Sequence, residues 1–588
     1  MKQFFKITFA SMLGFVLGLF ILIILFSIII GAIAGSKKST KAEIKPNSIL
    51  ELDLSYDIPE RSGNNMFSSG FSGFGSTTIG LNDIILNIKK AAENDNIKGI
   101  KLTCGLWPSD YATLNEIRNE LIAFKTNSGK FIIAYGEFMD EHSYYVASVA
   151  DKIYLNPAGQ ILLNGFSSQV IYLKNMLDKI GVEPQLIRHG KYKSAGEPFI
   201  TDKMSSENRQ QIETYLGNLY GYFVSQIAAS RGINENTLKD IIENLKTQNN
   251  LDAIKLGIID SVKYADEVEA ELKTACGIKP EEDLSVVSLK TFNNIPNPKT
   301  SVSDNKIAVL YCSGEIMNGK GNDEIIGSDK IAEIIKQIRT KNKYKALVVR
   351  INSPGGSSLA SDVIWREISL AKQKIPVVVS MGAVAASGGY YIAAPANKIF
   401  AQPNTITGSI GVFGLLINAK NLLNNKLGIN IETVKFGKYA DIGMPDRALT
   451  ADEKAILQNE VDKVYDDFIS NVAAGRNLTK QQVDELAQGR VYSGIEAKKL
   501  GLIDEFGGLN DAVKYAAELA KLEDYRTVNL PEQKEPFEEL LSILTDDAQA
   551  KFSKFALGEE YYNLYNQLNK IKHLQGIQAK MPFELKIE

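Results

Sequence analysis

The 588-residue chain is poor in the side chains on which most metal sites and catalytic triads depend. It contains three cysteines and three histidines, namely Cys104, Cys276, Cys312, His142, His189 and His573. The cysteines are far apart and form no CxxC pair, so neither a disulfide framework nor a zinc site is indicated. The histidines lack the HExxH spacing of a zinc peptidase. We therefore expect no metal and no cofactor, and a histidine-based mechanism would have few candidates.

An excess of charge of one sign is also missing. The 66 Lys and Arg residues against 69 Asp and Glu give a net charge of −3, which argues against a dedicated nucleic-acid binder. The hydrophobic content of 44% and the charged content of 23% exclude a mainly disordered or fibrous chain. At roughly 150 residues per domain, the length corresponds to about four small units or two large ones.

One long segment, from Ile7 to Ser36, has no charged residue at all. A helix over this stretch would be about 45 Å long, which exceeds the roughly 30 Å hydrocarbon core of a bilayer. A cleaved signal peptide with Ala32-Ile33-Ala34 at its cleavage site is the alternative, but its apolar core would be only about 7–15 residues long. We predict an uncleaved membrane anchor over residues 1–45. Lysines on both flanks leave its orientation open by charge.

Beyond this segment, the sequence predicts an α/β fold. Short apolar runs alternate with helical patterns, at Asn47–Tyr56, Ile100–Thr103, Phe131–Ala134, Lys306–Tyr311, Ala346–Ile351 and Pro376–Ser380. Residues 61–78 are rich in Gly, Ser, Asn and Phe and are expected to form a flexible surface loop. Its Phe67, Phe71 and Phe74 leave a membrane-facing or substrate-facing role open.

The chain also contains an internal repeat. Residues 135–157 align without a gap with residues 381–403, and the same spacing of about 246 residues recurs farther on. Gly190-Lys191-Tyr192 matches Gly437-Lys438-Tyr439, and Lys255-Leu256-Gly257 matches Lys499-Leu500-Gly501. We predict repeats at 46–290 and 304–530, a linker at 291–303 within the proline-containing segment Lys279–Ser303, and a helical appendage at 531–588.

The two copies differ where chemistry is expected. After a predicted strand, the second copy has Asn352-Ser353-Pro354-Gly355-Gly356, where backbone N–H groups can point into open space and form half of an oxyanion hole. A plain turn is the alternative. The second copy also places Ser387 near a helix N-terminus, where it is a candidate nucleophile or an ordinary N-cap. Glu141 stands at this position in the first copy.

A lysine shows the reverse pattern. Lys193 in the first copy aligns with Ala440 in the second, so one copy keeps the serine and the other keeps the lysine. Such reciprocal loss is expected of one Ser–Lys site shared between two halves. A buried lysine that has lost its proton can act as the general base that activates a serine hydroxyl. A solvated surface lysine is the alternative.

These motifs resemble the long, duplicated form of the bacterial signal peptide peptidase A (protease IV) family. The matching segments are NSPGG, MGAVAASGGYYIAAPA, TGSIGVFG and GKYKSAGEPF. The resemblance implies tandem Clp-protease/crotonase-like domains, a homotetramer, and a catalytic part that faces the periplasm from a single-pass anchor in the bacterial inner membrane. It also implies that Ser387 is the nucleophile, Lys193 the base, Ser409 a support for the lysine amine, and Gly356 and Gly388 the oxyanion-hole donors.

The sequence therefore predicts a membrane-anchored serine endopeptidase that degrades apolar peptides, such as cleaved signal peptides. Its expected partners are peptides, the membrane and further copies of itself, and no nucleic acid. Two alternatives are a crotonase-like acyl-CoA enzyme, which shares the backbone oxyanion hole, and a non-catalytic scaffold in membrane-protein quality control. A scaffold would not need Ser387 and Lys193 together.

Overall fold

The computed structural model of the protein describes a large part of the chain. The described residues are 44–63, 78–296, 303–322, 324–533 and 577–581, together with individual helical residues between 3 and 21. Among them, no helix combines the length and the apolar character needed to cross a membrane. Most of the predicted anchor at 1–45, including residues 22–43, and most of the predicted loop at 61–78 lie outside the described residues.

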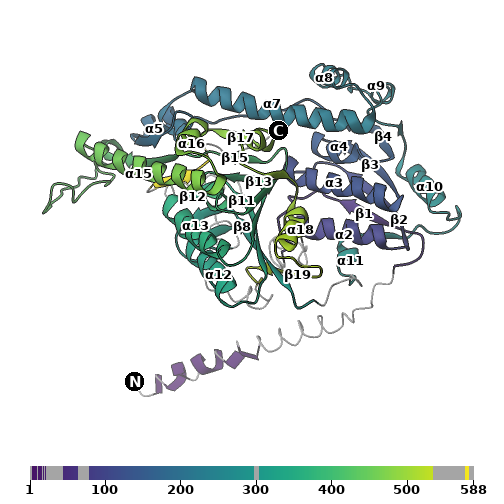
Figure 1. The fold of residues 1–588 in the computed structure, drawn as a ribbon, viewed down its shortest axis with the longest axis horizontal. Helices are drawn as coiled ribbons and strands as arrows, with labels where there is room; N and C mark the ends of the chain where they lie inside the picture. Colours follow the sequence, from purple (N-terminus) through teal and green to yellow (C-terminus); the bar gives the residue numbers. More distant parts are fainter. Residues whose placement is uncertain are drawn as a thin grey trace.

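The first half forms a parallel sheet covered by helices (Figure 1). Its strand order is β6-β4-β3-β2-β1-β7. The strands are β1 (Ser48–Asp53), β2 (Ile97–Cys104), β3 (Phe131–Met139), β4 (Lys152–Ile161), β6 (Ser261–Val262) and β7 (Val286–Ser288). The helices are α2 (Leu81–Glu93), α3 (Tyr111–Ser128), α4 (Glu141–Ala147), α7 (Ser206–Arg231), α8 (Glu235–Glu243), α9 (Asn250–Lys255), α10 (Ala265–Ala275) and α11 (Leu289–Asn293).

The second half repeats this plan. Its sheet has the order β17-β15-β13-β11-β8-β19, with β14 beside β13 and β18 beside β14. The strands are β8 (Lys306–Ser313), β11 (Ala346–Ser353), β13 (Val377–Ala386), β14 (Lys398–Ala401), β15 (Ile406–Gly408), β17 (Val491–Ser493), β18 (Glu505–Phe506) and β19 (Arg526–Leu530). The helices are α12 (Ser328–Thr340), α13 (Ser358–Lys372), α14 (Gly388–Ala393), α15 (Ala451–Arg476), α16 (Lys480–Leu486), α17 (Gly494–Lys499) and α18 (Leu509–Leu519). β11 is buried along nearly its whole length, as expected for a parallel strand between helical layers.

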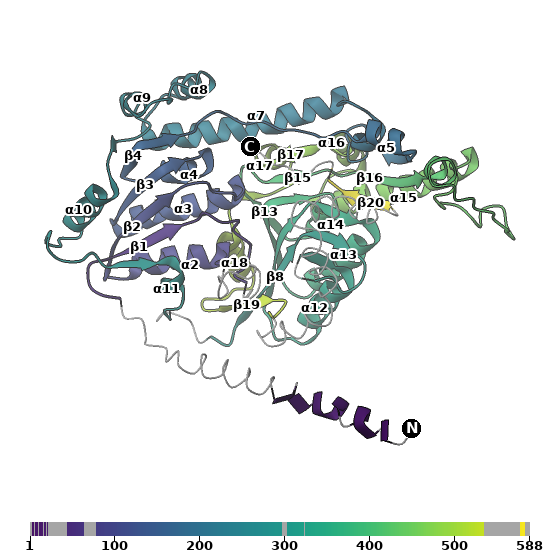
Figure 2. The same ribbon diagram turned by 180° about the vertical axis from the view of Figure 1, so that it is seen from behind.

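The duplication extends to single hydrogen bonds. The hydroxyl of Tyr144 donates to the Ile258 carbonyl at 2.8 Å, and that of Tyr390 donates to the Leu502 carbonyl, also at 2.8 Å. The long helices α7 and α15 have 26 residues each. Figure 2 shows α7 crossing from the first half to the second, where its apolar residues share a core cluster with Ala386 on β13. The first half therefore contributes to the surroundings of β13 in the second half.

A third sheet joins the halves, with the order β10-β9-β12-β20-β16-β5. It consists of β9 (Glu315–Met317), β10 (Ile325–Gly327), β12 (Gly355–Ser357), β16 (Val412–Asn418), β20 (Ile577–Lys580) and β5 (Glu183–His189). β5 comes from the first half, between α5 (Lys174–Ile180) and α6 (Glu197–Ile200), and pairs antiparallel with β16 along its whole length. A π-helical turn, η1 (Leu422–Lys426), follows β16. We call this third sheet the joining sheet.

The six apolar runs predicted as strands are confirmed as β1, β2, β3, β8, β11 and β13. Within the predicted linker at 291–303, residues 291–293 belong to α11, which packs Phe292 into the core of the first half. Of the predicted helical appendage at 531–588, residues 534–576 and 582–588 lie outside the described residues. The helical prediction is wrong for residues 577–580, which form β20 because they pair with the edges of β12 and β16.

Candidate active site

Ser387 lies at the sharp turn between β13 and α14. Its φ is 56°, a left-handed value that few non-glycine residues adopt, and its N–H donates to the Gly408 carbonyl at 2.8 Å. Within the described part of the chain its side chain makes no capping hydrogen bond to α14, so it does not act as an ordinary N-cap. Small residues are required around it, since a Cβ on Gly388 would lie 2.5 Å from Ser361 Oγ. Such a strained strand–turn–helix presents a serine hydroxyl for chemistry.

Lys193 follows β5 and reaches Ser387 across the junction between the halves. Its Nζ is 2.8 Å from Ser387 Oγ, 3.0 Å from Ser409 Oγ and 3.1 Å from the Ser409 carbonyl oxygen. The three side chains are completely buried. The structure thus brings together the three residues that the sequence nominated as nucleophile, base and support for the base.

The path of the backbone explains this meeting. The β5–β16 ladder carries the chain to Gly190, and the Tyr192 N–H then donates to the Gln488 carbonyl in the second half at 2.9 Å. A Cβ on Gly489 would lie 2.6 Å from Lys193 Cβ, so glycine is needed for the lysine backbone to approach so closely. The lysine is therefore positioned by backbone contacts with the half that carries the serine.

Burial determines the charge of the lysine. Desolvation disfavours the ammonium and lowers the pKa of Lys193 well below its ordinary value. A neutral amine has two N–H donors and one lone pair. Ser409 offers two acceptors, its hydroxyl and its carbonyl oxygen, which leaves the lone pair for the proton of Ser387. This arrangement suits a general base that acts on a serine hydroxyl.

Ser409 is itself held in an unusual conformation. Its φ is 50°, and its N–H donates to the Arg490 carbonyl at 2.7 Å. The strained backbone turns both the hydroxyl and the carbonyl of one residue toward the same amine. Ser409 therefore holds Lys193 Nζ at two points.

The glycine turn after β11 lies beside the serine turn. A Cβ on Gly355 would lie 2.7 Å from the amide nitrogen of Gly388, so the two turns are in close contact. The Gly355 φ of 93° favours glycine, and the Gly355 N–H donates to Ser353 Oγ at 3.2 Å. The side-chain oxygen of Asn352 accepts the Val384 N–H of β13 at 3.1 Å, which ties the turn to the strand that leads to Ser387. Gly355 and Gly388 thus have neighbouring backbones, and Gly356 is the next residue of the same turn.

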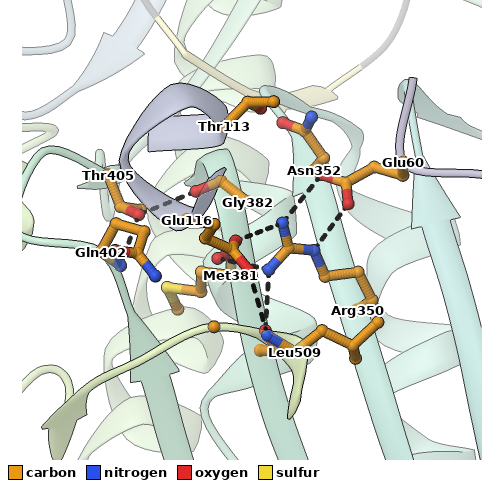
Figure 3. A network of polar contacts seen from close by, with 12 residues as sticks. Glu60, Thr113, Glu116, Arg350, Asn352, Met381, Gly382, Gln402, Thr405 and Leu509 are labelled. Carbon is orange, nitrogen blue, oxygen red and sulfur yellow. Dashed lines mark hydrogen bonds and ion pairs between the residues drawn. The ribbon is translucent and has the colours of Figure 1, made fainter. Parts of the chain in front are cut away.

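A buried ionic network lies under this turn (Figure 3). Arg350 on β11 has no exposed surface and pairs with Glu60 and Glu116 of the first half, with closest N–O distances of 2.7 Å to each. Its Nη1 also donates to Ser380 Oγ at 2.8 Å and to the Met381 carbonyl at 3.1 Å, both on β13. The two carboxylates raise the pKa of Arg350, so the guanidinium stays charged. Sequence reasoning missed this network, although an arginine inside the apolar run ALVVRINS signals a buried partner.

The corresponding place in the first half has no nucleophile. Glu141 accepts the N–H groups of Gly165 and Asn164 at 2.7 and 2.9 Å, and burial raises the pKa of Glu141 to about 7. The neighbouring His142 stacks on Tyr111 with ring centroids 4.4 Å apart. These contacts give Glu141 and His142 a structural role in the first half.

The second half offers no equivalent of the lysine at the aligned position. Ala440, which aligns with Lys193, is exposed. Its neighbours Lys435 and Lys438 are paired with Asp441 and Asp452. The described site therefore combines one residue from the first half with the serines and glycines of the second.

Comparison with known proteins agrees with the duplication. The model of peptidase family S49 matches residues 125–279 and 369–523, once in each half, and that of Clp protease matches residues 299–407. Protease 4 of Salmonella typhi is 36% identical over 504 residues, 83% of this chain and 80% of its own. The chloroplastic serine protease SPPA of Arabidopsis thaliana is 32% identical over 92% of this chain and 78% of its own. A putative signal peptide peptidase SppA of Enterococcus faecium is 37% identical over 42% of this chain and 75% of its own.

Proposed function

We propose that this chain, which belongs to peptidase family S49 and is a serine peptidase, cuts peptide bonds with Ser387 as nucleophile and Lys193 as general base. One observation carries the proposal: a buried lysine amine lies 2.8 Å from a serine hydroxyl on a strained turn. The lowered pKa of Lys193 supports it, because only a neutral amine can accept the serine proton.

The reaction follows from these positions. Ser387 Oγ attacks the carbonyl carbon of the substrate as its proton moves to Lys193 Nζ. The N–H groups of Gly356 and Gly388 donate hydrogen bonds to the carbonyl oxygen and stabilise the negative charge that develops on it. The ammonium then gives its proton to the leaving amine, the peptide bond breaks, and an acyl ester remains on Ser387. Water, deprotonated by Lys193, hydrolyses this ester and restores the serine. Ser409 holds the amine throughout.

The substrates that we propose are apolar peptides, including signal peptides left after preprotein processing. The name of the Enterococcus faecium relative and the resemblance of the motifs both favour this class. Apolar side chains near Ser387 also favour it. Ala386, which precedes the serine, shares a core cluster with Ile212 and Tyr215 of α7 and with Val491 of β17.

We further propose that residues 1–45 anchor the chain by a single pass in the inner membrane of a bacterium, with the catalytic part in the periplasm. The uncharged stretch Ile7–Ser36 supports the anchor, and the family resemblance supports the location. The same resemblance supports a homotetramer. Expression with a periplasmic reporter fused after residue 45 tests the orientation, and sedimentation of the purified chain tests the assembly.

Labelling with a serine-reactive phosphonate tests the central proposal. We expect one adduct, on Ser387, in the full-length protein, and none in Ser387→Ala or Lys193→Ala. Ser361→Ala is the matched control, because Ser361 is a buried serine beside the same turn whose hydroxyl donates to the Ser357 carbonyl. Retention of the adduct in Ser387→Ala would overturn the assignment of the nucleophile, and a protein that never reacts would favour the non-catalytic scaffold.

A further inference from the structure

One short segment between α16 and β17, residues 488–490, is in direct contact with the base. The Gln488 carbonyl accepts the N–H of Tyr192, the residue before Lys193, at 2.9 Å. A Cβ on Gly489 would lie 2.6 Å from the backbone nitrogen of Lys193 and 2.6 Å from its Cβ. The segment therefore fixes the place from which the lysine side chain starts.

The same segment holds the residue that supports the base. The Arg490 carbonyl accepts the Ser409 N–H at 2.7 Å, and the Gly489 N–H donates to the Ile410 carbonyl at 2.8 Å. One end of residues 488–490 thus bonds to the turn of the base, and the other end bonds to the turn of its support. We call these three residues the clamp, because a shift of the segment would move both groups.

The backbone of the clamp is strained. Gln488 has a φ of 53°, in the left-handed region that residues with a side chain seldom adopt, and Gly489 follows with a φ of 79°. A residue keeps such a conformation only when its surroundings determine it. The contacts of Gln488 with its neighbours are therefore needed to keep the clamp in shape.

Tyr465 of α15 and Asp484 of α16 supply these contacts. Gln488 Nε2 donates to Asp484 Oδ1 at 2.9 Å and to the Tyr465 hydroxyl at 3.2 Å, and the Gln488 N–H donates to the same hydroxyl at 3.4 Å. The Tyr465 hydroxyl in turn donates to Asp484 Oδ1 at 2.5 Å. A closed triangle of hydrogen bonds thus ties the side-chain amide of Gln488 to two helices of the second half.

We propose that Gln488 is a positioning residue for the base of the peptidase. Its amide, held by the tyrosine hydroxyl and the carboxylate, fixes the clamp, and the clamp keeps the Lys193 amine in its buried place. The proposal rests on the proposed function, because it takes Lys193 as the general base.

The proposal has a consequence that a purely structural role would not have. Burial is what lowers the pKa of Lys193, so a loosened clamp that admits water raises this pKa toward its ordinary value. Only the neutral amine accepts the proton of Ser387, so the rising limb of the pH–rate profile then moves to higher pH.

Gln488→Met in the full-length protein tests the proposal, because methionine keeps the length of the side chain and removes the amide. The rate of phosphonate labelling of Ser387 is measured as a function of pH. On the rising limb we expect this rate to fall about tenfold relative to the wild type, as for an upward shift of one pH unit. On the plateau at higher pH, where the amine is neutral in both proteins, the rates should be nearly equal.

The ionisable groups beside the clamp are the same in this variant. They are Arg490 of the clamp itself, the Tyr465 hydroxyl and Asp484 of the triangle, and His189, which pairs with Asp462 at 2.7 Å. Since Gln488→Met changes none of them, a moved limb reports the amine of the lysine.

Gln481→Met is the matched control. Gln481 lies on α16, is exposed, and donates to Glu485 Oε1 at 3.4 Å within the same helix, so this variant should keep the wild-type profile. Tyr465→Phe is a second test, because it removes the hydroxyl and keeps the ring that stacks on His189 with centroids 3.9 Å apart. It should move the limb in the same direction as Gln488→Met. Thermal unfolding checks that each variant is folded.

The position of the limb separates positioning from a general loss of structure. Damage to the fold would lower the labelling rate by the same factor at every pH and leave the limb in place. That result, or an unchanged profile in the folded variants Gln488→Met and Tyr465→Phe, would overturn the proposal. Failure of the proposed function would instead appear as a phosphonate adduct that survives Ser387→Ala.

Discussion

Lys193 Nζ and Ser387 Oγ are 194 positions apart in the sequence and 2.8 Å apart in the structure. The distance is short because β5 of the first half forms the edge of a sheet whose other strands belong to the second half and the C-terminal segment. The serine lies in the second repeat and the lysine in the first. The relationship makes the two halves interdependent, and the predictions below follow from it.

Replacement of Ser387 by alanine should abolish peptide cleavage without loss of the fold. The expected decrease in kcat/KM is on the order of 10³-fold or more, as for removal of a covalent nucleophile. Circular dichroism and thermal unfolding check that the variant is folded. Residual activity near the wild-type level in purified Ser387→Ala would show that another group attacks the peptide.

Replacement of Lys193 by methionine should abolish activity and stabilise the fold near neutral pH. The unfolded lysine keeps its proton up to its ordinary pKa of 10.5, whereas burial lowers the folded pKa well below that value. Between the folded and the unfolded pKa of Lys193, the folded state therefore binds fewer protons than the unfolded chain, and the free energy of unfolding rises with pH. The gain in Lys193→Met should be largest at pH 7 and should vanish as the pH approaches 10.5, as measured by urea unfolding.

The same lysine predicts the pH profile of catalysis. The rate should rise with pH as Lys193 loses its proton, and this limb should persist in His142→Ala and His189→Ala, which should each keep most of the activity. An inactive histidine variant together with an active Lys193→Met would contradict the amine base.

Sequence patterns identified most of the candidate site but not the ionic network of Arg350 that lies beneath it. Ser387, Lys193, Ser409 and the glycine turn lie in contiguous motifs that can be compared between the repeats. The partners of Arg350 could not be found in this way, because Glu60 is 290 positions away and lies in no repeated motif.

The misassigned C-terminal strand has a similar cause. The four residues of β20, IQAK, alternate between apolar and polar side chains, but so short a run also fits a helix, and Ala and Lys are depleted in strands. The free edges of β12 and β16 impose the extended conformation, so the assignment depends on tertiary contacts.

Replacement of Arg350 by methionine should destabilise the chain strongly and also reduce activity. It leaves the buried carboxylates of Glu60 and Glu116 without their partner, which costs about 3–5 kcal/mol of unfolding free energy. The turn that carries Gly356 begins directly after β11, so kcat should fall as well. The triple change Arg350→Met, Glu60→Gln and Glu116→Gln should regain much of the stability. Equal stability of the single and triple variants would contradict the ionic account.

Replacement of Glu141 by glutamine should leave activity almost unchanged and remove one pH dependence of stability. The folded pKa of Glu141 is raised to about 7 from an ordinary value of 4.5. The folded state therefore holds a proton that the unfolded chain has lost, and the unfolding free energy falls as pH rises between these values. Glutamine keeps an acceptor for the N–H groups of Asn164 and Gly165, so Glu141→Gln should be the more stable protein at pH 8. A large loss of activity would mean that the first half takes part in the chemistry at this position.

Neither half alone should hydrolyse peptides. The first half, roughly residues 46–290, has Lys193 but carries Glu141 in place of the serine. The second half, roughly residues 300–588, has Ser387 but carries Ala440 in place of the lysine. A serine hydroxyl without a base is a poor nucleophile near neutral pH, so the isolated second half should be at least 10³-fold less active than the whole chain.

Co-expression of the two halves gives the complementary result. If the β5–β16 ladder and the core shared with α7 re-form, part of the activity should return, and Lys193→Ala in the first half should remove it again. That variant is the matched control, since it keeps the contacts between the halves but lacks the amine. Activity of the second half alone at the level of the intact chain would show that its base is some group other than Lys193. In that case the reciprocal pattern of the two repeats would have no catalytic meaning.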